Sequence, residues 1–379
     1  MKTFIKDNAV MLHKILTALA DNLVKVFVPL LILKKNDDLK TGLIMCVVFL
    51  CVYSLLTAVL NYVLYKPLKF KPLTMILLHI IPVCALQFII SLYNECNFLI
   101  ILVYAVLLAL GQTFYSVASN NYFLFENQKT NAGKMSNGTS IGKIIMILIG
   151  GFILSSNDIG YITIICIIAS VFYILSIVPL FFIKDNYDVT LKTISEDTQK
   201  PCDKTDKKYY RIYHISFGIY QALMDTVIPV FLYINNLNFN TIVYIMAVIE
   251  VIKVLVTIIA QKIKSEKMFR ISVVTAIAIF CISTITIYFI KNNLIIYIFS
   301  VTISATFPLI FIPFMNRFCG KIKNTSDPQK YMSIRDVEIF SLRIILFALM
   351  LVGDMLPAFM FGILSAIIIA VLPFCKNFS

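Results

Sequence analysis

The chain has 379 residues, of which 60% are hydrophobic and 14% are charged, and its mean hydropathy is +0.89. These values exclude a soluble globular protein, because apolar runs of about 20 residues, each able to cross roughly 30 Å of hydrocarbon as a helix, recur along the whole chain. The net charge of +13 does not require nucleic acid as a partner, since a basic face beside the anionic headgroups of a lipid bilayer accounts for it.

Twelve apolar runs predict an all-α polytopic membrane protein. The first lacks a small-residue cleavage site after it, so we expect it to remain as a span. One long polar connection, "KDNYDVTLKTISEDTQKPCDKTDKKYYR", follows the sixth run, and its mixed charge predicts a solvated linker. We therefore expect an N-terminal six-helix bundle over 1–183, a cytoplasmic linker over 184–208 and a C-terminal six-helix bundle over 209–379. The expected spans are 8–33, 40–65, 72–92, 98–124, 136–154, 159–183, 209–234, 240–261, 270–290, 293–315, 331–353 and 356–375.

Basic residues favour one orientation, since short loops rich in Lys and Arg stay on the cytoplasmic side. With the N-terminus inside, the loops on the far side hold only Lys34, Lys35, Lys40 and Lys291. We therefore expect both termini in the cytoplasm and a plasma or inner membrane location. The cytoplasmic loops would hold the basic central linker and Lys66, Lys69, Lys71, Lys129, Lys134, Lys262, Lys264, Lys267, Arg270, Arg317, Lys321, Lys323 and Lys330.

Charged residues inside the spans are functional candidates, because an isolated charge at the bilayer centre costs several kcal/mol. In the first run, Asp21 and Lys25 are four residues apart and share a helix face. The fourth run carries Gln112 and Tyr115 on one face, which indicates either a substrate-lining surface or ordinary hydrogen bonding between helices. Lys143 lies in the fifth run.

The second half repeats this pattern. Asp225 lies in the seventh run, and Glu250 and Lys253 are three apart in the eighth. For these pairs and for Asp21 with Lys25, a set of self-neutralising ion pairs that fix helix packing remains the alternative to a hydrated site. The eleventh run, "SIRDVEIFSLRII", adds four further charged residues: Arg335, Asp336, Glu338 and Arg343.

The charged residues of the eleventh run differ in how far they lie from the cytoplasmic end of the span. Arg335 and Asp336, like Lys14 in the first run, lie near the cytoplasmic ends of their spans, where a long side chain reaches water easily. We interpret Arg335, Asp336 and Glu338 as helix-end anchors or a gating latch. Glu338 points away from the face of Asp336, so it should pair with Arg335 or with a neighbouring helix.

An internal repeat relates the two halves. A shift of 200 residues places "VFVPLLIL" (26–33) on "TVIPVFLY" (226–233), with Pro29 on Pro229. The same shift aligns Lys25 with Asp225, and further matched pairs extend it to other helices without a gap. This pattern favours two halves related by an axis along the membrane normal. The further pairs are Thr41 with Thr241, Thr57 with Thr257, Asn61 with Gln261 and Lys143 with Arg343.

With twelve spans, two similar halves, a basic loop after the sixth span and cytoplasmic termini, the chain resembles the major facilitator superfamily over essentially its whole length. The family's loop signature, Gly-x-x-x-Asp-Arg-x-Gly-Arg, is poorly represented. Its places hold "NYVLYKPLKFKP" (61–72) and "AQKIKSEKMFR" (260–270), which keep basic residues but lack the glycines and the Asp. The subfamily is therefore left unassigned.

The resemblance implies that the first, fourth, seventh and tenth helices line a central cavity, with the fifth, eighth and eleventh beside them. Asp21, Lys25 and Asp225 would then face the cavity from both halves. Lys143 and Arg343 would form a pseudo-symmetric basic pair able to clamp a carboxylate or phosphate, with Arg as a planar fork and Lys as a mobile point charge.

We therefore expect a secondary active transporter that moves a small organic ion or zwitterion by alternating access, with a proton carried by Asp21, Asp225 or Glu250. The alternative in the same class is a multidrug/proton antiporter. A membrane-embedded lipid-modifying enzyme is less well supported, because His13, His79 and His214 lie in separate runs without close acid partners, and a receptor or scaffold fits poorly with charges in paired halves. The expected protein is a monomer and not an enzyme.

We expect no cofactor and no metal. Five of the nine cysteines lie inside apolar runs, and no CxxC motif or Cys/His cluster occurs. The sequence also contains no Walker or GxGxxG motif, which disfavours ATP-driven transport. The five buried-run cysteines are Cys46, Cys51, Cys84, Cys166 and Cys281.

Overall fold

A computed structural model gives the fold, in which the described residues form helices joined by short turns and loops, with no strand among them. Within the part of the chain that the structure describes, four short helices are 3-10 turns and one segment is a π-helix. The structure describes residues 2–36, 38–64, 72–92, 97–126, 132–155, 159–182, 204–235, 237–263, 265–290, 292–322, 325 and 328–375.

Six transmembrane units make up the N-terminal half. The first unit is interrupted: α1 and α2 are separated by a 3-10 turn at Lys25–Phe27. The last ends in a 3-10 turn at Val178–Phe182. The helices are α1 (Lys2–Leu23), α2 (Val28–Lys34), α3 (Leu39–Leu64), α4 (Pro72–Leu92), α5 (Phe98–Glu126), α6 (Ala132–Ser155) and α7 (Ile159–Leu175).

Six more units make up the C-terminal half. Its first unit is again interrupted, here by a π-helix at Leu223–Val227. Its last unit is flanked by 3-10 turns at Gly353–Met355 and Leu372–Phe374. The helices are α9 (Lys204–Ala222), α10 (Ile228–Ile234), α11 (Phe239–Ala260), α12 (Glu266–Phe289), α13 (Asn293–Ile322), α14 (Pro328–Ser341), α15 (Arg343–Leu349) and α16 (Leu356–Val371).

The twelve units match the twelve predicted spans, and the predicted class of all-α polytopic protein is confirmed. Ten helices in the described residues are long and apolar enough to cross a membrane, and the apolar part of α6, Gly142–Ser155, is shorter. The predicted linker falls mostly on residues outside the described part of the chain, and α9 begins at Lys204. The boundaries of the two predicted bundles therefore stay a prediction.

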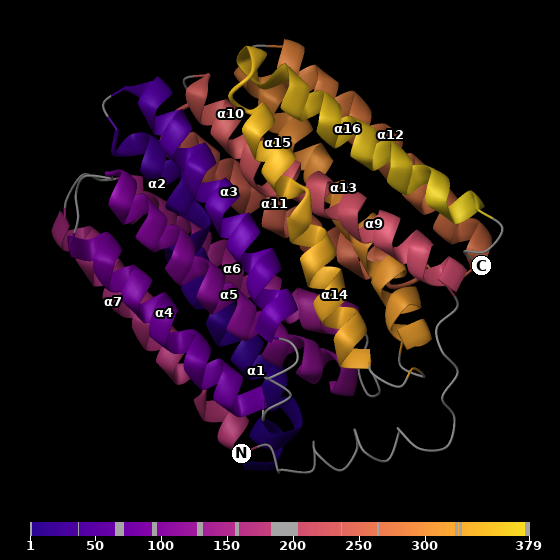
Figure 1. The fold of residues 1–379 in the computed structure, drawn as a ribbon, viewed down its shortest axis with the longest axis horizontal. Coiled ribbons are helices and arrows are strands. Elements are labelled where there is room, and N and C mark those ends of the chain that lie inside the picture. Colours follow the sequence, from indigo (N-terminus) through magenta and orange to yellow (C-terminus); the bar gives the residue numbers. More distant parts are fainter. Residues whose placement is uncertain are drawn as a thin grey trace.

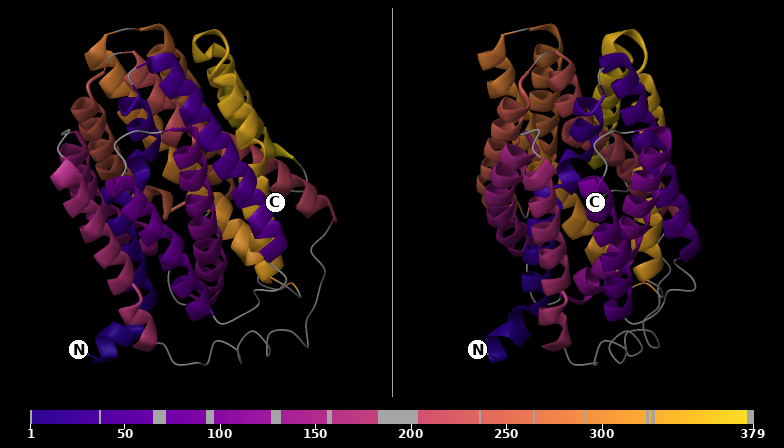
Figure 2. Two further views of the ribbon diagram at one scale, coloured as in Figure 1. Left: turned by 60° about the vertical axis from the view of Figure 1, so that its left-hand side comes forward. Right: turned by 90° about the vertical axis from the view of Figure 1, so that its left-hand side faces the viewer.

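Helices of each half pack mainly on one another (Figure 1). In the N-terminal half, α1 lies on α6 and α7, and α4 lies on α5 and α7. In the C-terminal half, α9 lies on α14 and α16, and α12 on α13 and α16. The halves meet where α6 packs on α11 and where α3 packs on α14 and α15. Figure 2 shows the helices of both halves running roughly side by side.

Two prolines explain the interruptions in the first and seventh units. Proline has no backbone N–H and its ring clashes with the carbonyl four residues earlier. Four residues before Pro29 is Lys25, whose carbonyl accepts a hydrogen bond from the N–H of Val28 instead, which tightens that turn to a 3-10 geometry. Four residues before Pro229 is Asp225, inside the π-helix. The irregular turns thus fall on the charged residues that the repeat aligns.

Aromatic contacts join the halves near α2 and α10, which also pack on each other. The rings of Phe27 and Phe239 are 5.9 Å apart, and Phe152 meets Tyr244 edge-to-face at 5.3 Å. The ammonium of Lys34 lies 5.5 Å from the Phe239 ring and also donates to the carbonyls that end α6. These contacts hold the two halves together at this end of the molecule.

Candidate functional site

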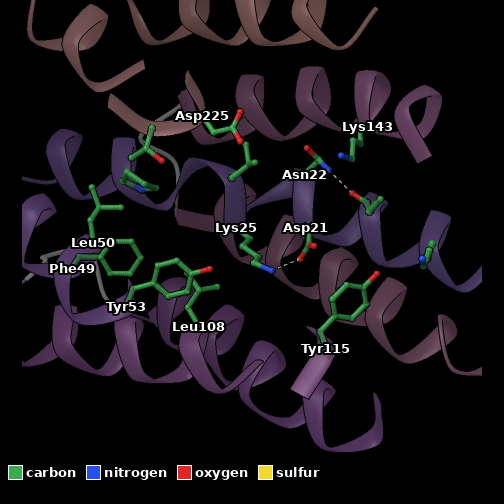
Figure 3. A pocket seen from close by; sticks show the side chains of 15 residues that line it. Asp21, Asn22, Lys25, Phe49, Leu50, Tyr53, Leu108, Tyr115, Lys143 and Asp225 are labelled. Carbon is green, nitrogen blue, oxygen red and sulfur yellow. Dashed lines mark hydrogen bonds and ion pairs between the residues drawn. The ribbon is translucent and has the colours of Figure 1, made fainter. Parts of the chain in front are cut away.

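A cavity of about 480 Å³ lies between the halves, where the charged residues of the first and seventh units come together (Figure 3). Its lining includes three lysines and two carboxylates, so it carries a net charge of +1. One wall is apolar and aromatic and comes from α3 and α5. The lining residues are Lys14, Ala18, Asp21, Asn22, Lys25, Val26, Pro29, Phe49, Leu50, Tyr53, Leu108, Tyr115, Lys143, Asp225 and Thr226.

Asp21 is held by two donors from its own half. The Lys25 ammonium lies 3.2 Å from Asp21 Oδ1, and the hydroxyl of Tyr173, on α7, donates to the same oxygen at 2.5 Å. Lys25 also donates to Gln112 Oε1 at 3.4 Å. The side chain of Asp21 is 27% exposed, so the carboxylate stays in contact with the cavity while it is paired.

The facing carboxylate belongs to a second cluster. Asp225 is 44% exposed and lies 3.8 Å from the ammonium of Lys253. Lys253 also pairs with Glu250 at 2.9 Å, so one cation serves two carboxylates. Lys143 of α6, in the cavity lining, adds its charge to the field at Glu250. The second half therefore offers a partly exposed acid with a shared counter-ion.

The predicted clamp of Lys143 and Arg343 is not formed in this structure. Lys143 lines the cavity, whereas Arg343 is absent from the lining and is bound to α9. Its Nε donates to the Gly218 carbonyl at 3.1 Å, its Nη2 donates to Gln221 Oε1 at 2.9 Å, and its guanidinium lies 4.4 Å from the ring of Phe340. The guanidinium finds these acceptors because α14 approaches α9 closely at Gly218, which sequence alignment of the two halves cannot show.

The predicted latch residues form two separate groups. Arg335 pairs with the adjacent Asp336, with Nη2 to Oδ1 at 2.6 Å. Glu338 binds His214 Nδ1 at 2.8 Å and lies 3.8 Å from Arg211 Nε. Both partners are on α9, a neighbouring helix, which is one of the two kinds of partner predicted for Glu338. A gating role for these residues stays a prediction.

Beneath Asp21 lies a buried layer of rings that the sequence did not indicate. The ring of Tyr115 lies 6.0 Å from His13 and 5.1 Å from His79, and the Tyr173 ring is 5.7 Å from His79. Each imidazole has its Nδ1 at 2.8 Å from a backbone carbonyl, that of Ser176 or of Gly111. This layer fixes Tyr173 and thereby the hydroxyl that reaches Asp21.

Gln112 and Tyr115 occupy the expected face of α5, and only Tyr115 is in the cavity lining. Ser119 continues this face in the sequence by three-and-four spacing, and its side chain is outside the described residues. Tyr173 gave no sequence signal, because it is a single tyrosine in an apolar run. Phe49 and Tyr53, four residues apart, could have been found as one face of α3.

The donor set of the cavity is suited to an organic ion. Carboxylates and ammonium groups line it, and no group of three or more His, Cys, Asp or Glu side chains that could hold a metal occurs in the described part of the chain. Twelve transmembrane units around a charged cavity that both halves line define a polytopic membrane transport protein.

Comparison with known proteins specifies the family. The sequence matches the Major Facilitator Superfamily over residues 10–324, and the chain belongs to that family. No curated protein matches the chain in sequence. The predicted resemblance is thereby confirmed, with the subfamily unassigned.

Solved structures show the same fold at low sequence identity. A bacterial homologue of the iron transporter ferroportin, in an outward-facing state, matches with a TM-score of 0.65 and 11% identity over 98% of each chain. A D-xylose–proton symporter matches with 0.63 and 12% over 97% of this chain and 96% of that one. The human organic anion transporter MFSD10 matches with 0.60 and 9% over 97% and 99%. The chain is a multi-pass membrane protein of a transporter family.

Proposed function

We propose that this protein is a secondary active transporter that moves a small organic anion or zwitterion by alternating access, coupled to protons through Asp21. The observation that carries the proposal is the central cavity, in which lysines of the N-terminal half and carboxylates of both halves surround a space of about 480 Å³. That volume is within the range of pockets that enclose small organic ligands.

The charges favour a solute with an anionic group. The lining holds Lys14, Lys25 and Lys143 against two carboxylates, so an added carboxylate or phosphate would meet a net positive site. A zwitterion would also match Asp225, which is partly exposed on the other half. The similar structures carry names for iron, xylose and organic anion transport, and at 12% identity or less they give precedents for the fold and not for the solute.

Asp21 is the proposed proton carrier because its negative charge is balanced by Lys25, which a solute could also engage. An anionic group bound by Lys25 would compete with Asp21 for that ammonium, and protonation of Asp21 would release Lys25 toward the solute. Solute and proton would thus bind together to the same ion pair, which is the linkage that coupling requires.

The test is transport by purified protein in proteoliposomes with a panel of organic anions and zwitterions. We expect a proton gradient to drive uptake of one class, and Asp21→Asn to abolish gradient-driven uptake while exchange of solute across the membrane continues. Asp354→Asn is the matched control, since Asp354 is exposed, lies outside the cavity and has a left-handed backbone (φ 49°) that Asn tolerates. Coupling through Asp21 is refuted if Asp21→Asn retains gradient-driven uptake.

A second candidate is multidrug/proton antiport, favoured by the wall of Phe49, Leu50, Tyr53 and Leu108. It predicts that hydrophobic cations compete for the cavity and that Tyr53→Ala weakens them more than it weakens organic anions. If lipophilic cations alone are transported, this candidate replaces the first. The specific membrane and the cytoplasmic placement of the termini remain part of the proposal.

A further inference from the structure

A second cavity, of about 320 Å³, lies entirely within the C-terminal half and shares no lining residue with the central one. It is bounded by the start of α9, the end of α13 and α14. Four cations line it, Lys207, Lys208, Arg211 and Lys321, together with one carboxylate, Glu338. With neutral histidine its net charge is +3. Hereafter we call it the basic pocket.

Aromatic rings position two of the lysines. The Lys207 ammonium lies 5.3 Å from the centre of the Tyr331 ring, and the Lys321 ammonium lies 5.9 Å from that of Tyr210. A cation over the face of an aromatic ring is attracted by the ring's quadrupole, which holds the ammonium group in place beside the pocket. Lysines at the mouth of this pocket are therefore oriented groups and not only a solvated charge run.

His214 forms the buried part of the pocket. The residue is 2% exposed, its Nδ1 binds Glu338 Oε2 at 2.8 Å, and its ring meets Phe318 edge-to-face at 4.7 Å. Its Nε2 is buried with no hydrogen-bond partner among the described residues. A buried polar atom without a partner is uncommon and indicates an absent water, ion or ligand. A hydroxyl or a protonated phosphate oxygen of a ligand can donate to it.

We propose that the basic pocket binds a phosphate-bearing anion, supplied either as the headgroup of an anionic lipid or as a small soluble phosphate ester. A phosphate monoester suits this lining because it carries close to two negative charges and three acceptor oxygens, which several converging cations can neutralise at once. The volume accommodates a phosphate with a short polar substituent.

The position of the basic pocket is accessible both to lipid headgroups and to soluble phosphate esters. Lys207 and Lys208 are exposed at the beginning of the seventh unit, where the helix leaves the apolar layer. Basic pockets between transmembrane helices at this depth are suited to lipid headgroups. In the orientation proposed from the basic loops, the pocket faces the cytoplasm, where soluble phosphate esters are also available.

The binding experiment compares probes that share one phosphate. Full-length protein in detergent is titrated with dioctanoyl phosphatidic acid, with glycerol 3-phosphate, which is the same headgroup without acyl chains, and with inorganic phosphate. Dioctanoyl phosphatidylcholine is the zwitterionic control, and native mass spectrometry or calorimetry gives the affinity. Phosphatidic acid binding far tighter than glycerol 3-phosphate identifies a lipid site, whereas comparable binding of the two identifies a soluble ligand.

Variants locate the site. Lys207→Gln/Lys321→Gln should weaken the preferred probe by about 5-fold for each lysine, or roughly 25-fold together, since each basic group near a charged headgroup is worth about 1 kcal/mol. Lys262→Gln/Lys267→Gln removes the same charge from two exposed lysines, one in the loop after α11 and one in the first turn of α12, and should leave affinity within about 2-fold. His214→Asn keeps a nitrogen near the Nδ1 position toward Glu338 and removes Nε2, so it should weaken binding. Its melting temperature should also fall, because a buried ring that packs on Phe318 is truncated, so the lysine pair remains the main test.

The proposal is overturned if no probe binds more tightly than phosphatidylcholine, or if the control pair loses as much affinity as the pocket pair. It does not depend on the proposed transport function, because binding is measured without transport and Asp21→Asn should bind the probe as the wild type does.

Discussion

Replacing Lys253 by Met tests whether the cluster on the second half is held by charge. Lys253 is the cation that Glu250 and Asp225 share, at 2.9 Å and 3.8 Å. Its side chain is 18% exposed and that of Glu250 is 11% exposed. Methionine keeps much of the volume of lysine and removes the charge, so the change leaves a nearly buried carboxylate without its close partner.

The magnitude follows from the burial of the two acids. Removal of one partner from a buried ion pair costs about 3–5 kcal/mol. Asp225 is 44% exposed and can be hydrated, and the charge of Lys143 still acts on Glu250, so we expect the low end, about 3 kcal/mol. Glu250→Gln/Lys253→Met removes both members of the close pair and should recover most of this loss, to within about 1 kcal/mol of the wild type.

Thermal unfolding in detergent, followed by a thiol-reactive dye, suits a chain with nine cysteines and no tryptophan. Cys46, Cys166 and Cys319 are buried and would react only on unfolding. At roughly 2 °C for each kcal/mol, the single variant should melt roughly 6 °C below the wild type. The reasoning is refuted if Lys253→Met melts with the wild type, or if the double variant melts as low as the single one. A stable double variant without transport would show that the cluster does more than fix packing.

Three further changes address single contacts. Tyr173→Phe removes the hydroxyl that donates to Asp21 and should destabilise the Asp21 carboxylate by about 1–2 kcal/mol. Gradient-driven uptake should therefore be slower, whereas Tyr161→Phe, at an exposed tyrosine, should transport normally. Gly218→Ala places a Cβ against the Ile339 carbonyl and should lower the free energy of unfolding by about 1–3 kcal/mol. Gly320→Ala, whose Cβ would have nothing within 4 Å, should be neutral or slightly stabilising. Equal melting temperatures for the two variants contradict the close approach at Gly218. Asp38 accepts hydrogen bonds from the Thr41 hydroxyl and from the N–H groups of Thr41 and Lys40, and these bonds lower its pKa below 3.8. The stability that the ionised carboxylate adds is therefore complete above pH 3.8 and is lost as pH falls through the lowered pKa. The melting temperature of the wild type should therefore exceed that of Asp38→Ala at neutral pH, and the difference should shrink as pH falls below 3.8 and through the lowered pKa; a difference that stays constant throughout acid titration contradicts this account.

The spans could be predicted because membrane insertion depends on length and hydropathy, which are properties of the sequence alone. Four of the five charged residues that face the cavity could also be predicted, because a retained charge in an apolar run requires a partner or water. The fifth, Lys14, is interpreted from the sequence as a residue at the cytoplasmic end of its span. Asp21, Lys25, Lys143 and Asp225 all line the cavity as the repeat and the family resemblance implied.

The partners of these residues could not be predicted. A partner depends on the rotation of each helix and on how closely two helices approach, and both follow from packing across the whole bundle. Arg343 aligns with Lys143 in sequence, yet the glycine at 218 brings α9 within reach of the guanidinium and removes it from the cavity. Tyr173 reaches Asp21 from α7 for the same kind of reason, because the sixth unit packs directly on the first.

Both halves have a proline-induced interruption in their first helix, and its geometry differs between them. Each places a proline four residues after a charged residue, so that the regular hydrogen bond to that residue's carbonyl is lost. At Lys25 the backbone forms a tighter 3-10 turn, and at Asp225 it forms a wider π-helical turn. Both turns line the cavity, and beyond them α2 and α10 pack on each other. A turn that already lacks its regular hydrogen bonds needs to break fewer of them when it bends. The weakest points of the first and seventh units therefore coincide with the charges of the site, and binding at those charges can act directly on the segments that join the halves.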